Sequence, residues 1–540
     1  MRSRKQPRVS VEEDRSDEKE DASPPSTATG TPQQEVKEHV PTFLERLYKI
    51  VGELEPTPGL EDRVRSVLKL SCAAANAEPV VASRHLTEEQ MLQYVADYFN
   101  AYYVILPFFD PDTWIRKAKT AWRAADNQVT LSESLDLAIV YMLIALGSCG
   151  SFSASFSGFE DSVWSREYDA RAQKIVPNPF ERPPSLRLLQ YLAVKTLHKM
   201  AQNNFSEAYM YSGLMVRNAV VLGLHLVDPA EDYEKHRAWY SVYIFEKYWG
   251  FAAGRPSSIG LEYPPPIPYP PAFHNNSIYA MSTEHCLIRL RLCDLSIKFL
   301  TSSALIGTNK AAHQSITKTL QLVVDADNQL EEIIQSSKDP HLKAFQINPD
   351  FTDIQCREWY WIRLFYWFIK LILYRPFLFT SHYFDLTETH IPPDTLNSLV
   401  IGTQRCLEAA LAIPPIVAEI NSRLERCQLN WFSNTYLECA SVVIILYCAS
   451  LASNNQTPPQ TVIQAMCRSY RHMNGCRESK LQDLTIDLLK DQSFLAMLGA
   501  NRQLLVKCFF GASIDPPSPH EDLDALWNKT LRLIGFQVIC

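Results

Sequence analysis

Apolar residues recur at intervals of three and four along most of the chain, and no stretch alternates between apolar and polar residues as a strand does. That spacing places apolar side chains on one face of a helix. The pattern therefore predicts an all-α protein, built as a large bundle-like array of helices. The predicted helices span Thr87–Tyr102, Pro111–Ala125, Ser132–Gly147, Leu186–Met200, Glu207–Leu226, Tyr233–Gly250, Thr283–Ser302, His313–Ser336, Cys356–Leu373, Leu396–Ala412, Trp431–Ala452, Pro459–Met473 and Ala500–Gly511.

Composition divides the chain into four segments. Residues 1–40 are rich in Ser, Thr, Pro, Glu and Asp and poor in aliphatic residues, so burial cannot offset the entropy of ordering them. We expect a disordered tail there, with a basic part followed by an acidic part. Residues 41–85 are expected to form a helical linker, and residues 86–395 the main helical domain. Residues 396–540 would add a C-terminal helical part that packs on the same body.

Composition also limits the function. With 540 residues, of which 46% are hydrophobic, the chain can bury one large core or two smaller ones. A net charge of −8 and a pI near 5.9 argue against a broad nucleic-acid-binding surface, because phosphate neutralisation needs clustered Lys and Arg. Any contact with DNA is therefore expected to be local or supplied by another module.

The cysteines and the apolar stretches indicate an intracellular protein with no membrane contact. Thirteen cysteines are scattered without a Cys-x-x-Cys pair, and the N-terminus is too polar for a signal peptide. The apolar stretch Ala440–Ala452 is too short to span a bilayer. The longer stretch Trp361–Phe379 contains Arg and Lys residues, and we interpret it as a helix that ends at Pro376.

The helix predicted around residues 207–226 has apolar residues on nearly every face, so we expect it to be almost surrounded by protein. Gly213 would permit the close approach of a neighbouring backbone. Gly223 lies near the helix end, before Asp228 and Pro229. Leu224 belongs to the apolar surface of the same segment.

Arg217 is the charged exception on this apolar surface, and a charge removed from water needs a partner. Glu246 is the first candidate partner, with Arg255 competing for the same carboxylate. One interpretation is a buried ion network of Arg217, Arg237, Glu246 and Arg255 that fixes two helices and a loop. The other is direct contact of these residues with an effector. The neighbouring His225 is expected to be a core residue or a helix C-terminal cap, not a ligand or a catalyst.

Residues 205–259 carry a motif in three parts. A first helix contains a small residue, an arginine and an alanine and ends in Leu-Gly-Leu-His. A second helix contains Arg-x-Trp, and a Gly-Arg-Pro loop follows it. This motif resembles the signature of the fungal-specific transcription factor domain, the all-helical regulatory region that usually follows a binuclear zinc-cluster DNA-binding domain. The matching residues are Gly213, Arg217, Ala219, Leu222, Gly223, Leu224, His225, Arg237, Trp239, Gly254, Arg255 and Pro256.

Further segments are similar to the same family, so that the resemblance covers about residues 90–380. They are Tyr98–Trp114, Ser185–Ala193 and Leu373–Leu378. Two positions depart from the family pattern of paired Trp and of Asp-Arg, because this chain has Trp239-Tyr240 and Glu246-Lys247. The ion-pair geometry is expected to differ, since Lys does not make the planar bidentate contacts of Arg.

The zinc cluster that the resemblance would imply is not encoded here. A binuclear cluster needs six cysteines within about thirty residues, whereas Cys72 is the first cysteine and Cys149 the next. We find no Cys2His2 spacing and no basic region that leads into heptads. DNA contacts are therefore expected from a module upstream of this sequence or from a partner, and zinc would be needed only with such an upstream cluster.

A basic cluster near the N-terminus has two interpretations. The functional interpretation is a nuclear-import signal or the basic tail that follows a zinc cluster. The other interpretation is a solvated terminus without a function. The cluster consists of Arg2, Arg4, Lys5 and Arg8.

Enzyme motifs are missing from the sequence. It contains no phosphate loop, no Gly-x-Ser-x-Gly elbow, no His-Glu-x-x-His and no dinucleotide fingerprint. Asp325 and Asp327 could form part of a magnesium site, but no second metal-binding motif accompanies them. An exposed helix face is the favoured interpretation of these two aspartates. Cys286 and Cys293 share one helix face and are interpreted as buried thiols. We therefore expect no enzyme, no catalytic or metal-binding residues and no cofactor.

The resemblance implies a nuclear transcriptional regulator of fungal metabolic or secondary-metabolite biosynthesis genes. Its helical regulatory domain, residues 86–395, would respond to a small-molecule effector or to a partner and would carry contacts of a homo- or heterodimer. The alternative is a helical corepressor or interaction partner of a zinc-cluster factor that does not itself bind DNA. An all-α enzyme ranks third.

Overall fold

The structure is a computed structural model, and the residues that it describes all belong to the unit Val40–Cys540. The predicted tail of residues 1–40, the linker of residues 41–85, the basic cluster and the helix Ala500–Gly511 lie outside the described residues. The described part comprises residues 86–124, 131–150, 158–202, 204–228, 231–252, 257–260, 263, 281–301, 316–383, 392–424 and single residues between 436 and 469.

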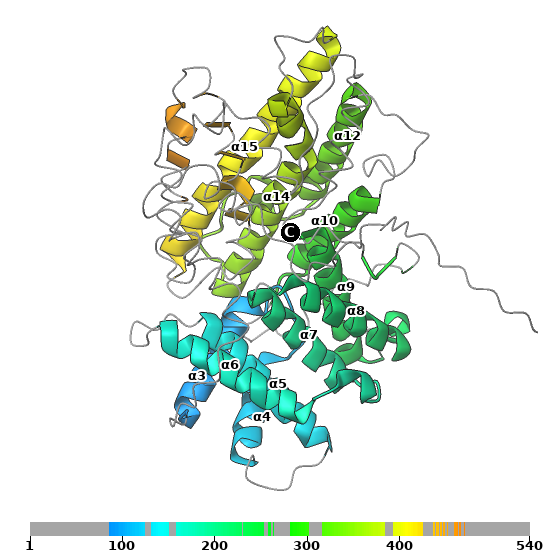
Figure 1. Ribbon diagram of the computed structural model, residues 1–540, viewed down its shortest axis with the longest axis vertical. Helices are drawn as coiled ribbons and strands as arrows, with labels where there is room; N and C mark the ends of the chain where they lie inside the picture. Colours follow the sequence, from blue (N-terminus) through cyan, green and yellow to red (C-terminus); the bar gives the residue numbers. More distant parts are fainter. Residues whose placement is uncertain are drawn as a thin grey trace, which may run out of the picture. The chain divides into compact units, whose positions relative to one another are not determined.

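Every regular element in the described part of the chain is helical, which confirms the all-α prediction. The helices follow one another along the chain as shown in Figure 1. They are α3 Glu88–Tyr102, α4 Pro111–Ala124, α5 Leu131–Gly150, α6 Gly158–Ile175, η1 Pro179–Glu181, α7 Leu186–Ala201, α8 Phe205–Val221, η2 Leu224–Leu226, α9 Tyr233–Ala252, α10 Thr283–Thr301, α12 Ile316–Gln335, α13 Pro340–Lys343, α14 Asp353–Tyr383 and α15 Pro393–Arg423.

Side chains at the helix starts explain where several helices begin. Thr87 accepts a hydrogen bond from the backbone of Gln90, whose side chain accepts one from the backbone of Thr87, so the two form a capping box before α3. Ser185 caps α7 and Asn204 caps α8 in the same way, each accepting from a backbone N–H one turn on. These caps satisfy donors that would otherwise have no partner.

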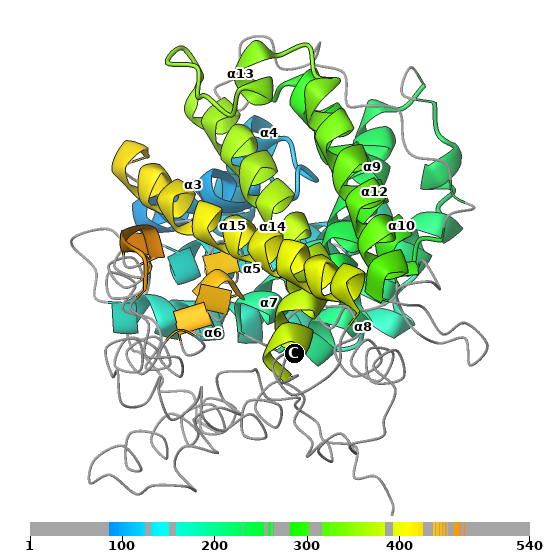
Figure 2. The same ribbon diagram turned by 90° about the horizontal axis from the view of Figure 1, so that it is seen from above.

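The helices pack in two groups. In the first group α5 contacts α3, α4, α6 and α7, and in the second group α14 contacts α10, α12 and α15. Helix α9 contacts α7 and α8 as well as α10, so it lies between the groups, as Figure 1 shows. Figure 2 shows α9 next to α10. Aromatic side chains extend this contact to α14, because the Tyr248 ring lies 5.1 Å from Trp361 and 5.0 Å from Phe365, centroid to centroid.

Two helices continue past internal prolines, and one of these prolines, Pro376, was predicted to end its helix. Helix α14 runs through Pro376, and α15 runs through Pro414 and Pro415. Proline in a helix interior costs about 3 kcal/mol, since it removes a hydrogen bond and crowds the preceding turn. The buried Phe377 and Leu378, which follow Pro376, retain their packing when α14 continues. Tertiary packing therefore overrides the local break.

Helix α6 was not predicted, and its sequence explains why. Gly158–Ile175 mixes charged and aromatic residues without a continuous apolar stripe. Its buried side chains Trp164, Tyr168 and Ala172 nevertheless face the first helix group, where α6 packs on α5.

One described helix, Pro393–Ile420, is long and apolar enough by composition to cross a membrane, with a mean hydropathy of 1.2 in its best window. This stretch belongs to α15, which packs along α14 and α12. Its inward side chains, such as Cys406, Ile413 and Val417, are fully buried among these helices. In this window 44% of the helix is buried, so one face of α15 packs inside the protein.

Candidate functional site

The residues of the sequence motif lie on α8, η2, α9 and the segment that follows α9. Gly254, Arg255 and Pro256 are outside the described residues, so the competition of Arg255 for a carboxylate stays a prediction. The motif residues that are described make three separate sets of contacts, centred on Glu246, on Arg217 and on His225.

Glu246 is buried on α9 and holds the segment that follows this helix. One carboxylate oxygen accepts a hydrogen bond from the Ser257 hydroxyl, and the other accepts from the backbone N–H of Ser258. The Ser257 hydroxyl oxygen also accepts from the Ile259 N–H at 3.2 Å. Burial raises the pKa of Glu246, and the hydrogen bonds from Ser257, Ser258 and Ile259 oppose that rise. The carboxylate thus fixes the path of the chain after α9.

Arg217 does not take the predicted position. The side chain is exposed, its guanidinium donates to the Gly213 carbonyl at 3.2 Å, and no ion pair joins it to Glu246 within the described part of the chain. The reason is the orientation of α8, which turns Met210 and Val221 outward with 66% and 70% of their surface exposed. The expectation of a nearly surrounded helix was therefore wrong for this face.

Side chains, not a neighbouring backbone, lie where a Cβ at Gly213 would point. A Cβ built at this position would lie 3.1 Å from a terminal nitrogen of Arg217 and 3.9 Å from the Ser258 hydroxyl. The glycine thus lies between the exposed arginine and the segment that Glu246 holds.

Gly223 ends the long helix of the motif. Its φ of 67° lies in the left-handed region, and its N–H donates to the Val220 carbonyl at 2.9 Å. The chain then forms the short helix η2, in which Leu224 is buried. The half-buried ring of His225 lies between Trp239, at 5.8 Å, and Tyr263, at 5.5 Å between ring centroids.

Arg237 and Trp239 are buried on α9, as the motif places them, and the Arg237 guanidinium lies 5.7 Å from the centre of the Tyr233 ring. One turn after Tyr243, the buried Lys247 donates to Asp294 at 2.8 Å and to the Tyr243 hydroxyl at 2.7 Å. This lysine, where the family pattern has an arginine, acts as a point charge that joins α9 to α10.

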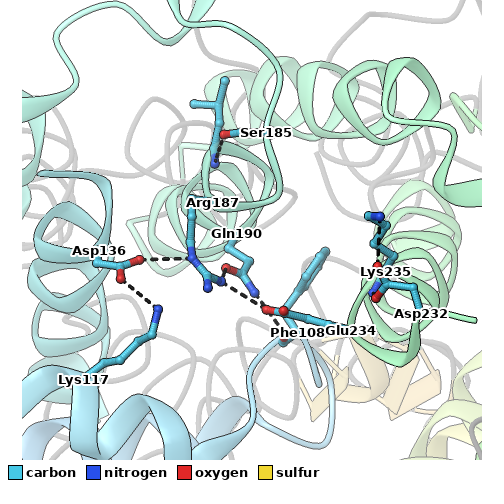
Figure 3. Close-up of polar contacts among 10 residues, drawn as sticks. Phe108, Lys117, Asp136, Ser185, Arg187, Gln190, Asp232, Glu234 and Lys235 are labelled. Carbon is cyan, nitrogen blue, oxygen red and sulfur yellow. Dashed lines mark hydrogen bonds and ion pairs between the residues drawn. The ribbon is translucent and has the colours of Figure 1, made fainter. Parts of the chain in front are cut away.

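A second polar network, which the sequence did not reveal, centres on Arg187 of α7 (Figure 3). Its guanidinium pairs with Asp136 of α5 at 3.2 Å and with Glu234 of α9 at 3.1 Å. Lys117 of α4 shares the Asp136 carboxylate at 2.8 Å. One arginine therefore connects three helices, because its planar fork presents donors in several directions.

The neighbouring Gln190 completes this network. Its amide nitrogen reaches the Phe108 carbonyl at 3.4 Å, and its oxygen accepts from Arg187 at 2.7 Å (Figure 3). Two segments noted separately in the sequence, Tyr98–Trp114 and Ser185–Ala193, are thereby in direct contact.

A buried cluster between α6 and α7 contains Ser165, Asp169, Lys195 and His198. The His198 Nε2 lies 2.9 Å from the Ser165 hydroxyl, and its Nδ1 lies 3.8 Å from Asp169, which pairs with Lys195. Burial lowers the pKa of His198 to about 4. Serine, histidine and aspartate in this order can activate a nucleophile. Here the serine and the histidine are buried, with 4% and 0% of their surface exposed, and they join α6 to α7.

The acidic and thiol residues that were weighed as metal ligands have other roles. Within the described ranges, no group of three or more His, Cys, Asp or Glu side chains is arranged to hold a metal ion. Asp327 is not on an exposed face, because it pairs with Lys370 at 2.9 Å and accepts from Tyr374 at 2.9 Å. Cys286 and Cys293 are free, buried thiols.

Comparison with known proteins finds similar sequences over most of the described helices. The model of the fungal specific transcription factor domain matches residues 95–288, the stretch from α3 to the start of α10. The chain is 26% identical over 431 residues to the zinc finger protein grt1 of Schizosaccharomyces pombe, an alignment that covers 77% of this chain and 64% of that protein. The chain thus spans less than two thirds of that relative.

A second relative aligns over a shorter stretch. The transcription factor FBD3 of Fusarium pseudograminearum is 30% identical over 171 residues, which are 31% of this chain and 22% of that protein. The FBD3 protein of Gibberella moniliformis is 27% identical over 170 residues. The family match and these relatives confirm the resemblance drawn from the motif. Residues 95–288 of this chain are therefore the part that matches the fungal specific transcription factor domain.

Proposed function

We propose that this protein regulates transcription in the nucleus of a fungus and that its targets are metabolic or secondary-metabolite biosynthesis genes. The observation that carries the proposal is the match of residues 95–288 to the fungal specific transcription factor domain, within which Glu246 of α9 holds the segment that follows this helix. The relatives named as a zinc finger protein and as transcription factors support it.

Contact with DNA would come from outside these residues. The sequence has no set of six clustered cysteines, so it cannot hold a binuclear zinc cluster, and its net charge is −8. A module beyond this sequence or a partner protein, in a homo- or heterodimer, would provide the DNA contacts.

The helical domain would act as a switch between two helix packings. Glu246 supports this idea, because a single buried carboxylate sets the path of the chain after α9 while Lys247 ties α9 to α10. A ligand or partner that binds one packing better would shift the equilibrium toward it. Moving the segment held by Glu246 would cost free energy, and this cost would reduce the net affinity of the ligand or partner.

The test is chromatin occupancy of the tagged protein expressed from its native locus. We expect focused peaks at promoters that depend on sequence upstream of Met1. Deletion of that sequence should abolish the peaks, while a variant of the exposed Arg291 should leave them intact. Uniform background in a cell where the tagged protein is abundant and nuclear would contradict a role in transcription.

A second candidate function is a corepressor that reaches promoters through a zinc-cluster partner. The net negative charge and the lack of a zinc cluster in this sequence favour it. In that case the promoter peaks would be independent of sequence upstream of Met1 and would disappear when the partner gene is deleted.

A further inference from the structure

Arg289 is a fully buried arginine without a hydrogen-bond acceptor. It lies on α10 with 0% of its surface exposed, and its Nε and both terminal nitrogens have no hydrogen-bond partner among the described residues. The guanidinium carbon instead lies 4.8 Å from the centre of the Trp361 ring on α14. Guanidinium is always charged and carries five N–H donors. A buried charge of this kind is strongly unfavourable unless an acceptor is supplied.

The buried carboxylate of this region is already engaged elsewhere. Glu358 of α14 accepts from the Ser282 N–H at 2.9 Å and from the Cys286 thiol at 3.8 Å. The Nδ1 atom of His285 lies 3.7 Å from the same carboxylate. No ion pair reaches Arg289 within the described part of the chain.

The groups around Arg289 are aromatic rings and hydrogen-bond donors. Burial raises the pKa values of Tyr240 and Tyr248 on α9, and the nearby charge of Arg289 opposes both rises. The Tyr240 hydroxyl donates to the Cys286 carbonyl at 3.1 Å, and the Tyr248 hydroxyl bonds that of Tyr436. The indole N–H of Trp361, also buried, has no acceptor among the described residues.

We propose that Arg289 binds the carboxylate of a small organic acid, whose apolar body contacts the rings of Trp361 and Tyr248. A planar guanidinium makes two parallel hydrogen bonds to a carboxylate, which no other side chain here offers. The two rings lie 5.1 Å apart, centroid to centroid, and provide an apolar surface beside the charge. This inference rests on the proposed function, because such an acid would be the effector of the regulatory domain.

The position of the site suits an effector. Helix α10 packs against α9 and α14. The Arg289 guanidinium lies over the Trp361 ring of α14, and its charge opposes the rise in the pKa of Tyr248 on α9. A ligand bound there would draw the three helices together. One residue before Tyr248, Lys247 already joins α9 to α10, so the ligand would stabilise the same contact.

The experiment is thermal unfolding and calorimetric titration of the purified full chain with sodium benzoate and sodium succinate. Parallel titrations with sodium phosphate and sodium chloride test whether an inorganic anion has the same effect. We expect at least one carboxylate to raise the melting temperature of the wild type by about 3 °C or more at saturating concentration. Arg289→Met should abolish the shift. Arg289→Lys should weaken binding about tenfold or more, because lysine retains the charge without the planar fork.

Arg291→Met is the matched control. Arg291 lies two residues further along α10, is exposed and donates to the Ser336 hydroxyl at 2.8 Å, so its loss should leave the shift unchanged. Without ligand, Arg289→Met should be at least as stable as the wild type, since it removes an unpaired buried charge.

Three results would overturn the inference. The first is that neither carboxylate stabilises the wild type more than Arg289→Met. The second is that phosphate alone does so, which would define an inorganic anion site. The third is that Arg289→Met unfolds or melts well below Arg291→Met, which would assign Arg289 a purely structural role. A carboxylate that binds through Arg289 but leaves promoter occupancy and transcription unchanged would sustain the site and contradict the effector response of the proposed function.

Discussion

Buried charges in this protein are stabilised in three different ways. Glu246 accepts hydrogen bonds from serines and backbone N–H groups, and Lys247 pairs with a carboxylate and a phenol. Arg289 has only the face of a tryptophan ring. A buried polar group that is hydrogen-bonded contributes modestly to stability, whereas the same group without partners is costly. The first two groups are therefore sensitive to loss of their partners, and the third has capacity for a further one.

Replacement of Glu246 should separate the roles of its charge and of its hydrogen bonds. Glu246→Ala leaves the Ser258 N–H without its acceptor and is expected to reduce the free energy of unfolding by about 2–4 kcal/mol. Glu246→Gln retains an acceptor oxygen for Ser258 and gains an amide that can donate to Ser257, so its loss should be below about 1 kcal/mol. Urea unfolding of the three proteins at pH 7 measures the difference.

Comparison of the wild type with Glu246→Gln at different pH values also tests the pKa of Glu246. Because burial raises the folded pKa above the ordinary value of 4.5, the carboxyl group favours folding when it is protonated. Its contribution is fully present below pH 4.5 and decreases as the pH rises through the folded pKa. Glu246→Gln should lack this decrease. Equal losses for the alanine and glutamine variants would contradict the predicted role of the hydrogen bonds.

The lowered pKa of the buried His198 predicts that the protein loses stability in mild acid. Its pKa is about 4 in the folded protein and about 6.5 in the unfolded chain, so the unfolded state takes up a proton first as the pH falls. The stability is complete above pH 6.5 and decreases by up to about 3 kcal/mol as the pH falls toward 4. Urea unfolding between pH 7 and pH 4 measures this decrease.

The control for His198 is His198→Gln, whose amide can still bond the Ser165 hydroxyl but does not titrate. The neighbouring Asp169, whose folded pKa is lowered despite its burial, changes charge mainly below this window. Burial lowers the pKa of the neighbouring Lys195, and its pairing with Asp169 opposes that fall. If the glutamine variant lost as much stability between pH 6.5 and pH 4 as the wild type, histidine would not be the cause.

At the scale of the element, close approach of helices depends on residues that sequence patterns treat alike. Gly147 of α5 lies directly against the backbone of α3, where a Cβ would come within 1.8 Å of the Tyr94 carbonyl oxygen. Gly213 of α8 has only the flexible end of Arg217 nearby, at 3.1 Å. Substitution by alanine should therefore lower the stability at Gly147 and should not lower it at Gly213.

Gly147→Ala is expected to reduce the free energy of unfolding by about 3 kcal/mol, because the two helix backbones must separate. Gly213→Ala should be neutral or stabilise the protein by up to about 1 kcal/mol, since alanine favours the helix and the Arg217 side chain can move. Thermal and urea unfolding of the two variants test this. A Gly147→Ala protein as stable as Gly213→Ala would show that α3 and α5 do not pack this closely.

Periodicity predicted most helices well, and it was inaccurate where tertiary contacts decide. The boundaries of α3, α4, α7 and α10 lie within a residue or two of the prediction, because caps and apolar stripes are local signals. The continuation of α14 past Pro376 depends on packing against α15, which no local pattern reveals. The domain boundaries proposed from composition stay predictions, and the one at residue 395 falls in the first turn of α15.

The polar contacts were harder to predict than the helices. Sequence reasoning identified Glu246 as a buried partner but assigned it to Arg217, because hydroxyl and backbone donors leave no spacing signature. Arg289 and Arg291 lie two residues apart on α10, yet one is fully buried and the other exposed. Only the arrangement of α9 and α14 around α10 distinguishes them.

At the scale of the whole molecule, α9 is enclosed on every side, from His236 to Ala252. Backbone amides of such a helix exchange their hydrogens with solvent only when a large part of the fold opens. Exchange at α9 should therefore be the slowest in the described part of the chain and should report global opening. The exposed face of α8 around Met210 and Val221 should instead exchange through local fraying. Comparing the two helices by mass spectrometry would show whether a signal inside the domain loosens one surface or the entire body.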